Sequence, residues 1–160
     1  MVRLLLDRPE VKAGARDGNG LTPIWQTAWN GNKDITTLLL ARSDVDVNVR
    51  DKEGTAPLWR TGWRGQREVV RLLLARPDVN ADIRDRHVLT PLSRAAGKGY
   101  TEIVRQLLAR LDTYVNVRDR YYRSPLSCAA EQAHRDIVRL LLDGADVRAD
   151  LRDINGSSSL

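Results

Sequence analysis

The sequence predicts an all-α solenoid in which short pairs of helices stack side by side. Two features of the 160-residue chain predict this fold: prolines recur every 34 residues, and so do Arg-Asp pairs. The prolines stand at Pro23, Pro57, Pro91 and Pro125, and the pairs begin at Arg16, Arg50, Arg84, Arg118 and Arg152. A fixed period of this length is typical of repeat proteins, in which each unit buries its apolar face against its neighbours.

The first helix of each repeat is expected to span about two turns. A hydroxyl residue at the N-cap with a proline behind it favours helix starts at Thr22, Thr90 and Ser124. Glycines that adopt the left-handed conformation are expected to end these helices at Gly31, Gly65 and Gly99. Ala133 departs from this pattern in the last repeat, and Ala56 replaces the capping threonine in the second. Because a lost cap costs about 1 kcal/mol, we expect the second repeat to be locally weaker.

The second helix of each repeat carries an apolar stripe at i, i+3 and i+4 spacing, as at Ile35, Leu38 and Leu39. Its first turn is acidic and its end is basic, which suits the helix dipole. The acidic residues are Asp34, Glu68, Glu102 and Asp136, and the basic ones are Arg42, Arg76 and Arg110. The segment 45–49 that follows alternates apolar and polar residues like a strand and leads into a turn-forming cluster at 50–54.

The repeat resembles that of a known family. Residues 20–31 read Gly-Leu-Thr-Pro-Ile-Trp-Gln-Thr-Ala-Trp-Asn-Gly, which is similar to the G-x-T-P-L-H-x-A-A-x-x-G signature of ankyrin repeats. The step of 34 residues, and Val88 and Tyr122 at the turn-glycine position, depart from the family pattern. The resemblance implies an all-α ankyrin-repeat solenoid with β-hairpin loops. The full repeats are expected at 16–49, 50–83, 84–117 and 118–151, with partial repeats at 1–15 and 152–160.

Neither end of the sequence carries the polar cap that a solenoid needs. We expect that the chain comes from a longer array, and the alternative is end-to-end self-association through the uncapped termini. The resemblance also implies that a partner contacts the hairpin tips and the concave side of the first helices.

All four tryptophans stand on the first helices of two adjacent repeats, as the i, i+4 pairs Trp25 with Trp29 and Trp59 with Trp63. One face of two neighbouring helices therefore carries four indoles. Trp25 and Trp59 are expected to pack between repeats, with a place in the groove as the alternative. A basic ridge runs beside the indoles, with Arg60 and Arg64 on one first helix and Arg94 and Lys98 on the next. No acidic residue on these two helices offsets it. The predicted partner-binding residues are Trp29, Trp63, Arg60, Arg64, Arg94 and Lys98 in the groove and Arg86, Tyr121 and Arg123 at the tips.

Arginine beside tryptophan is the composition of interface hot spots. The sequence therefore predicts a protein-protein interaction module that binds an acidic or aromatic partner segment in its concave groove. Nucleic-acid binding through the basic ridge is the first alternative, although the net charge is only +5 and Arg-Asp pairs neutralise part of it. The second alternative is an enzyme or small-molecule binder that uses the tryptophans and arginines as a pocket. Some ankyrin-repeat proteins bind methyl-lysine in tryptophan cages, but nearby guanidinium groups would repel such a cation.

Catalytic, metal-binding and cofactor-binding residues are not expected. The chain has two histidines, His87 and His134, and one cysteine, Cys128, in no known nucleophile, phosphate or metal pattern. Cys128 and His134 fall on different predicted helices, so their spacing does not predict a catalytic pair. The sequence also lacks the run of about 18 apolar residues that a membrane span requires. We expect a protein of the cytoplasm, with the nucleus as the alternative.

Overall fold

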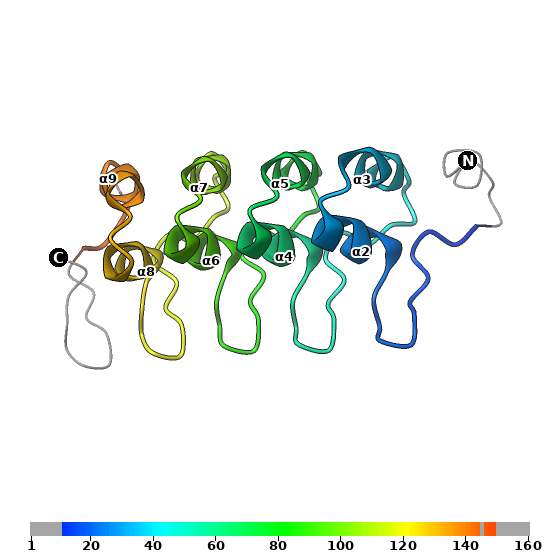
Figure 1. The fold of residues 1–160 in the computed structure, drawn as a ribbon, viewed down its shortest axis with the longest axis horizontal. Coiled ribbons are helices and arrows are strands. Elements are labelled where there is room, and N and C mark those ends of the chain that lie inside the picture. The colour runs from blue at the N-terminus through cyan, green and yellow to red at the C-terminus, as the bar shows by residue number, and fades with distance from the viewer. Residues whose placement is uncertain (1–10, 145, 150–160) are drawn as a thin grey trace.

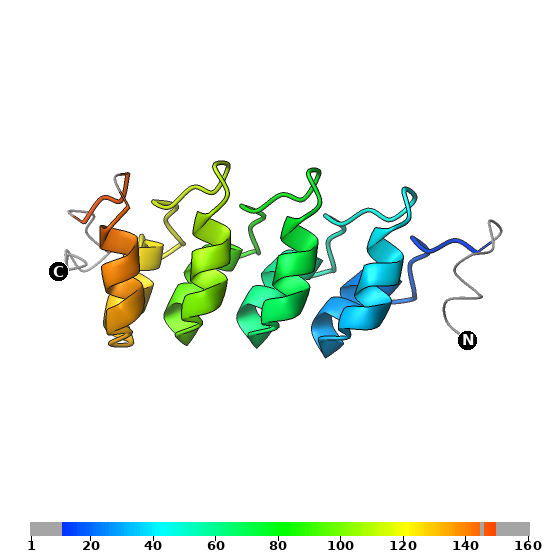
Figure 2. The ribbon, with the colours of Figure 1, turned by 90° about the horizontal axis from the view of Figure 1, so that it is seen from above.

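The computed structural model describes residues 11–144 and 146–149, and within them the chain forms eight short helices in two layers (Figure 1). The helices follow each other as α2 (Pro23–Asn30), α3 (Lys33–Leu40), α4 (Pro57–Arg64), α5 (Arg67–Leu74), α6 (Pro91–Lys98), α7 (Thr101–Leu108), α8 (Pro125–Glu131) and α9 (Arg135–Leu142). The even-numbered helices form one layer, from which hairpin-shaped loops project, and the odd-numbered helices lie side by side in the other (Figure 2).

The fold is therefore the predicted helical solenoid. No helix of the described part of the chain is both long and apolar enough to pass through a bilayer. Most of the partial repeats predicted at the two ends, and with them the proposed self-association, lies outside the described residues.

The ends of the first helices follow the predicted pattern with one exception. The side chains of Thr90 and Ser124 accept hydrogen bonds from the third residue of their helices, as expected of N-caps. Thr22 is the exception: its side chain makes no cap hydrogen bond, and its hydroxyl is buried without a hydrogen-bond partner. At the other end, Gly31, Gly65 and Gly99 all adopt the left-handed conformation.

Three residues other than glycine also adopt left-handed backbone: Val88 (φ 65°), Tyr122 (φ 61°) and Ala133 (φ 56°). Gly54, which precedes Val88 by one repeat, has φ 76°, so the hairpin tip keeps its shape where the glycine is missing. This conformation is strained for any residue with a Cβ, and most for a β-branched one.

Replacing Val88 with glycine should therefore stabilise the protein by about 0.5–1 kcal/mol. This figure is the backbone strain energy that the change removes, minus the cost of the additional conformational entropy that glycine loses on folding. Urea denaturation measures this change. Val88→Ala is the matched control, because it keeps a Cβ in the left-handed region and should recover only part of the gain. A glycine variant less stable than the wild type would contradict the strain assignment.

The alternating segment 45–49 is part of the core. Val45, Val47 and Val49 are all buried, while the described residues contain no assigned strand. The segment alternates like a strand without forming one, because alternation records which side chains face the core and not whether a ladder of backbone bonds forms. Asn48, between the buried valines, donates from Nδ2 to the carbonyl of Asp78 in the next repeat (2.7 Å).

Arginines after the second helices join neighbouring repeats. Arg76 donates to the carbonyl oxygens of Leu40 (2.9 Å) and Arg42 (3.3 Å) in the preceding repeat. Its guanidinium also binds the carboxylate of Asp78 (2.7 Å) and holds the pKa of that carboxyl below its usual value. Arg110 repeats these contacts one period later. The sequence suggested that these cations serve their own helix, but they instead keep successive repeats in register, so that residues 34 apart line up as columns.

Candidate functional site

The four indoles form one continuous cluster across α2 and α4. The ring centroids of Trp25 and Trp29 are 5.7 Å apart with the planes within 10°. Trp29 contacts Trp63 across the repeats at 6.1 Å, and Trp63 contacts Trp59 at 6.2 Å. Such separations are typical of favourable aromatic pairs. The stacking of the repeats thus brings together four residues that are up to 38 positions apart in the sequence.

The inner and outer tryptophans of the cluster have different environments. Trp25 and Trp59 are only 6% and 4% exposed. Their indole N–H groups donate to the carbonyls of Thr55 (3.3 Å) and Leu89 (2.8 Å) in the following repeat. The inner pair therefore packs between repeats. Trp29 and Trp63 are only partly buried, which leaves part of each indole available to a ligand.

Arg60 lies at the centre of the cluster. Its Cζ atom is 4.9, 4.7, 5.3 and 5.4 Å from the ring centroids of the four tryptophans, in sequence order. Its Nη2 atom donates to Asp51 Oδ2 and to Thr55 Oγ1, both at 3.1 Å. The Arg60 side chain is only 13% exposed and that of Asp51 only 7%. The indole cage is therefore already occupied by a cation of the protein itself, which leaves no central place for a methyl-lysine.

Half of the predicted basic ridge is neutralised by acids from the loops. Arg94 repeats the Arg60 arrangement, because its guanidinium binds Asp85 (3.3 Å) and lies 5.0 Å from the Trp59 ring. In both repeats the acid precedes the arginine by nine residues. Sequence reasoning missed these pairs because it examined only the helices that carry the arginines. The repeated Asp-x8-Arg spacing was the available signal.

The other half of the ridge has a different character. Arg64 and Lys98 are exposed, and the described part of the chain places no acidic side chain within ion-pair distance of either. The Arg64 guanidinium lies over Trp29, with Cζ 4.5 Å from the ring centroid. The structure thus brings Arg64 together with Trp29 across the repeats, while Arg60 and Arg94 belong largely to the packing beneath the outer indoles.

The predicted tip residues lie on different repeats. Arg86 is exposed, pairs with Glu53 of the preceding tip at 3.3 Å and donates to the Lys52 carbonyl. Tyr121 is exposed beneath the guanidinium of Arg123 (5.2 Å), which also binds Glu131 (3.1 Å). Tyr121 and Arg123 thus form a small group in the fourth repeat, two repeats beyond the indoles.

The cysteine and histidine do not form a reactive pair. Burial raises the pKa of Cys128 to about 11, so its thiol keeps its proton near neutral pH and is a poor nucleophile. His134 Nε2 lies 3.3 Å from the Gly97 carbonyl oxygen. Within the described ranges, no three His, Cys, Asp or Glu side chains gather closely enough to hold a metal ion.

Comparison with known proteins agrees with the architecture. The family described as "Ankyrin repeats (3 copies)" matches residues 1–87 and 65–150, which together cover all but the last ten positions. A search of curated proteins finds no match. The 34-residue period and the paired helices joined by hairpin-shaped loops are the features that such repeats share. The chain therefore belongs to the ankyrin-repeat family.

Proposed function

We propose that the chain is a protein-protein interaction module that binds an acidic or aromatic partner segment over α2, α4 and α6. Ankyrin repeats are generally protein-protein interaction modules, and the family is typically non-enzymatic. The observation that carries the proposal is Arg64, an exposed cation with no acidic partner among the described residues that lies over the partly exposed Trp29. Arg86, Tyr121 and Arg123 at the tips would add to the choice of partner.

This surface has the properties of a binding hot spot. Tryptophan and arginine are the residues enriched at such spots. The base of the surface is rigid, because Trp25 and Trp59 are bonded to the next repeat and Arg60 is held by Asp51. A rigid surface loses little conformational entropy when a partner binds. Arg64 keeps its full capacity for a carboxylate of the partner, since charge-assisted hydrogen bonds are the strong ones.

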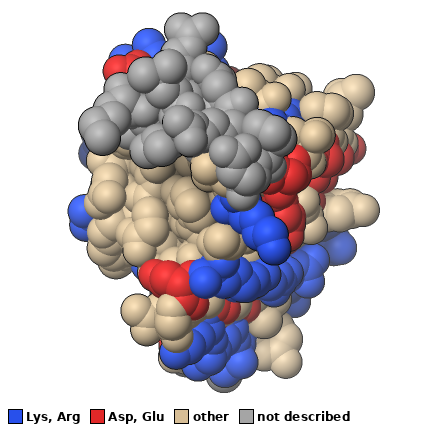
Figure 3. All heavy atoms as spheres, turned by 90° about the vertical axis from the view of Figure 1, so that its right-hand side faces the viewer, with Lys and Arg blue, Asp and Glu red and all other residues tan. Residues whose placement is uncertain are grey.

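Ion pairs within the basic ridge weaken the case for nucleic-acid binding. Arg60 and Arg94 already neutralise loop carboxylates, and on the N-terminal end face basic and acidic side chains lie next to each other (Figure 3). Each cation that is already paired releases fewer counterions when it approaches phosphate. We therefore place the partner among proteins.

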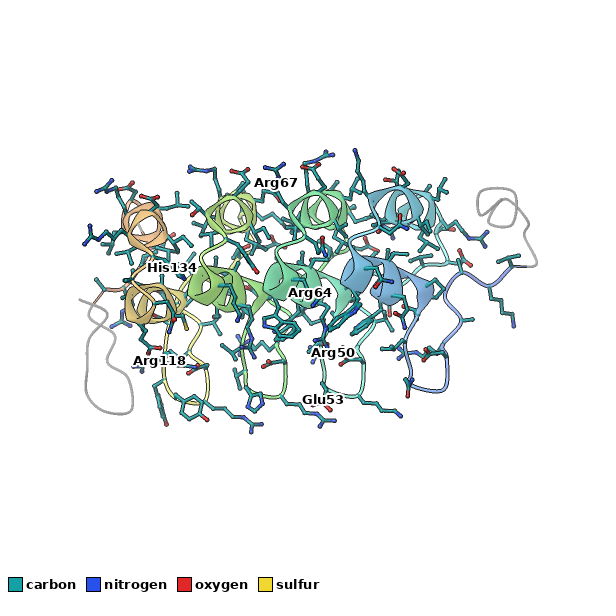
Figure 4. All side chains as sticks on the ribbon, viewed as in Figure 1. Arg50, Glu53, Arg64, Arg67, Arg118 and His134 are labelled. Atoms are coloured by element: carbon teal, nitrogen blue, oxygen red, sulfur yellow. The ribbon has the colours of Figure 1, made fainter. Side chains whose placement is uncertain are left out.

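Arg64→Glu is the test of the proposed function. It should reduce the capture of the partner from a lysate of the native host at least about tenfold, because it replaces the unpaired cation by a repelling charge. Arg67→Glu makes the same change of charge on α5, in the other helix layer (Figure 4), and should capture the partner as the wild type does.

Equal capture by the two variants would place the binding surface elsewhere. Binding to random oligonucleotides that falls steeply with salt and is lost in Arg64→Glu would instead support the nucleic-acid alternative. Circular dichroism and thermal melting check that both variants fold.

A further inference from the structure

The columns of tryptophans stop at the third repeat. Ser93 and Gly97 stand 34 residues after Trp59 and Trp63, on the same side of α6. In their place the structure has a hollow of about 240 Å³ between α6 and α8, here named the α6/α8 hollow. Ser93 and Gly97 both line it, so the hollow exists because two small residues replace two indoles.

We propose that the α6/α8 hollow receives one aromatic side chain, tyrosine or tryptophan, from the partner segment that lies in the groove. The partner's ring would extend the cluster of indoles by one repeat. This inference rests on the proposed function, because it assigns a position to one side chain of that partner.

The walls of the hollow suit an aromatic ring. They carry three cations, those of Arg94, Lys98 and Arg123, and cations attract the face of an aromatic ring. The molecule already contains this arrangement one repeat earlier, where Arg60 lies 5.4 Å from the Trp63 ring on the same helix. Arg94 follows Arg60 by one period, and its ion pair with Asp85 holds the guanidinium in place before a ligand arrives.

A carboxylate suits the hollow less well. Arg123 is already paired with Asp119 (2.8 Å) and with Glu131 (3.1 Å), and Arg94 is paired with Asp85, so that of the three cations Lys98 alone has no acidic partner among the described residues. Glu131 also lines the hollow, and its negative charge would repel an acidic side chain. The same carboxylate can accept a hydrogen bond from a tyrosine hydroxyl or an indole N–H. Among partner side chains, an aromatic one with a donor therefore matches both the cations and Glu131.

Two substitutions at one position separate an open hollow from a filled one. Gly97→Trp places an indole where α2 and α4 already carry Trp29 and Trp63. Gly97→Ala is the matched control, because its Cβ would meet the Cys128 Cβ at 3.5 Å, an ordinary contact, and the hollow stays open.

The probes are N-acetyl-tryptophanamide, N-acetyl-tyrosinamide and, for comparison, N-acetyl-glutamic acid amide. They are added to the ¹⁵N-labelled chain, and the amide signals of residues 93 and 97 are followed by NMR. Saturable shifts with the aromatic probes are expected in the wild type and in Gly97→Ala, and their loss is expected in Gly97→Trp. The absence of shifts in the wild type at millimolar probe, their persistence in Gly97→Trp, or larger shifts with the glutamic acid probe would overturn the proposal.

Partner capture distinguishes this proposal from the proposed function. Gly97→Trp should weaken capture at least about tenfold relative to Gly97→Ala. Undiminished capture by Gly97→Trp, together with loss of capture by Arg64→Glu, would overturn the proposal that the α6/α8 hollow binds an aromatic side chain. The proposed function would then still stand. Loss of capture by Gly97→Trp with full capture by Arg64→Glu would support the hollow and overturn the role of the Arg64 surface.

Discussion

Replacing Arg60 with alanine is expected to lower the free energy of unfolding by about 3 kcal/mol, since removing one partner of a buried ion pair leaves the other charge uncompensated. The charge left behind is that of Asp51, which is 7% exposed and lies 3.1 Å from the Arg60 guanidinium. The variant also loses the only cation that lies within 5.5 Å of all four indole centroids in the described part of the chain, and leaves the space it filled empty.

Urea denaturation followed by tryptophan fluorescence and circular dichroism measures this loss. Arg64→Ala is the matched control, because Arg64 is exposed, has one indole contact and lies on the same helix. The control should lower the free energy of unfolding by less than about 1 kcal/mol. Similar small losses in the two variants would show that Arg60 is not the central support of the cluster.

The second large effect on stability is expected at a column of equivalent loop residues, whose side chains form hydrogen bonds to the next repeat. Asn48 donates to the Asp78 carbonyl (2.7 Å) and accepts from the Asn80 backbone N–H (2.7 Å). Asn116 does the same two periods later, with the Asp146 carbonyl at 2.6 Å and the backbone N–H of residue 148 at 2.9 Å. An asparagine side chain at this place therefore donates one hydrogen bond to the next repeat and accepts another from it.

Asp82 occupies the middle of this column. Its carboxylate accepts from the Tyr114 backbone N–H (3.0 Å), but it carries no hydrogen for the carbonyl of Asp112, the residue equivalent to Asp78. Burial raises the pKa of Asp82 above its usual 3.8, and the charge of Asp112 adds to this. The Tyr114 N–H and the charge of Arg84 act in the opposite direction. The joint between the second and third full repeats thus lacks one hydrogen bond and holds a disfavoured charge.

Asp82→Asn should raise the free energy of unfolding by about 1–2 kcal/mol at neutral pH, the value of a restored hydrogen bond. Because the pKa of Asp82 is higher in the folded than in the unfolded chain, ionisation destabilises the fold as the pH rises through these values. The cost is fully present above the folded pKa and disappears below the unfolded one. The advantage of the variant should therefore shrink as the pH falls toward about 4.

Urea denaturation of the variant and the wild type, at neutral pH and at about pH 4, measures the difference in their free energies of unfolding. Asp136→Asn, an exposed position in the first turn of α9, is the control and should not stabilise the protein. An Asp82→Asn variant that is less stable than the wild type at neutral pH would contradict the missing hydrogen bond. A gain that stays constant with pH would contradict the role of the charge.

The sequence predicted those features that follow from the period itself. Pro91 and Gly99 give the bounds of α6 to within a residue, because a proline start and a left-handed glycine end are local backbone effects. The four-indole face was predictable because residues 34 apart line up when the repeats stack. The α6/α8 hollow was implicit in the same alignment, through Ser93 and Gly97, but appears only when the tryptophan columns are followed into the third repeat.

Contacts made by long side chains were much harder to predict. The bonds of Arg76 to Leu40 and Arg42 depend on how far an arginine reaches into the preceding repeat, and the ion pair of Arg60 with Asp51 depends on its reach to a loop of its own repeat. Spacing along one helix contains no such information. The basic ridge therefore seemed more positive in the sequence than it is in the structure, where Arg60 and Arg94 are paired and Arg64 and Lys98 alone keep an unpaired charge among the four.

The indole N–H signals of the four tryptophans test the docking surface most directly. Each gives a separate peak in a ¹⁵N NMR spectrum, which can be recorded while a partner recovered by capture is added. We predict that the peaks of Trp29 and Trp63 shift most, while those of Trp25 and Trp59, whose N–H groups are bonded to backbone carbonyls, shift least. Unmoved Trp29 and Trp63 peaks at saturation with the partner would contradict the claim that this face of α2 and α4 binds it.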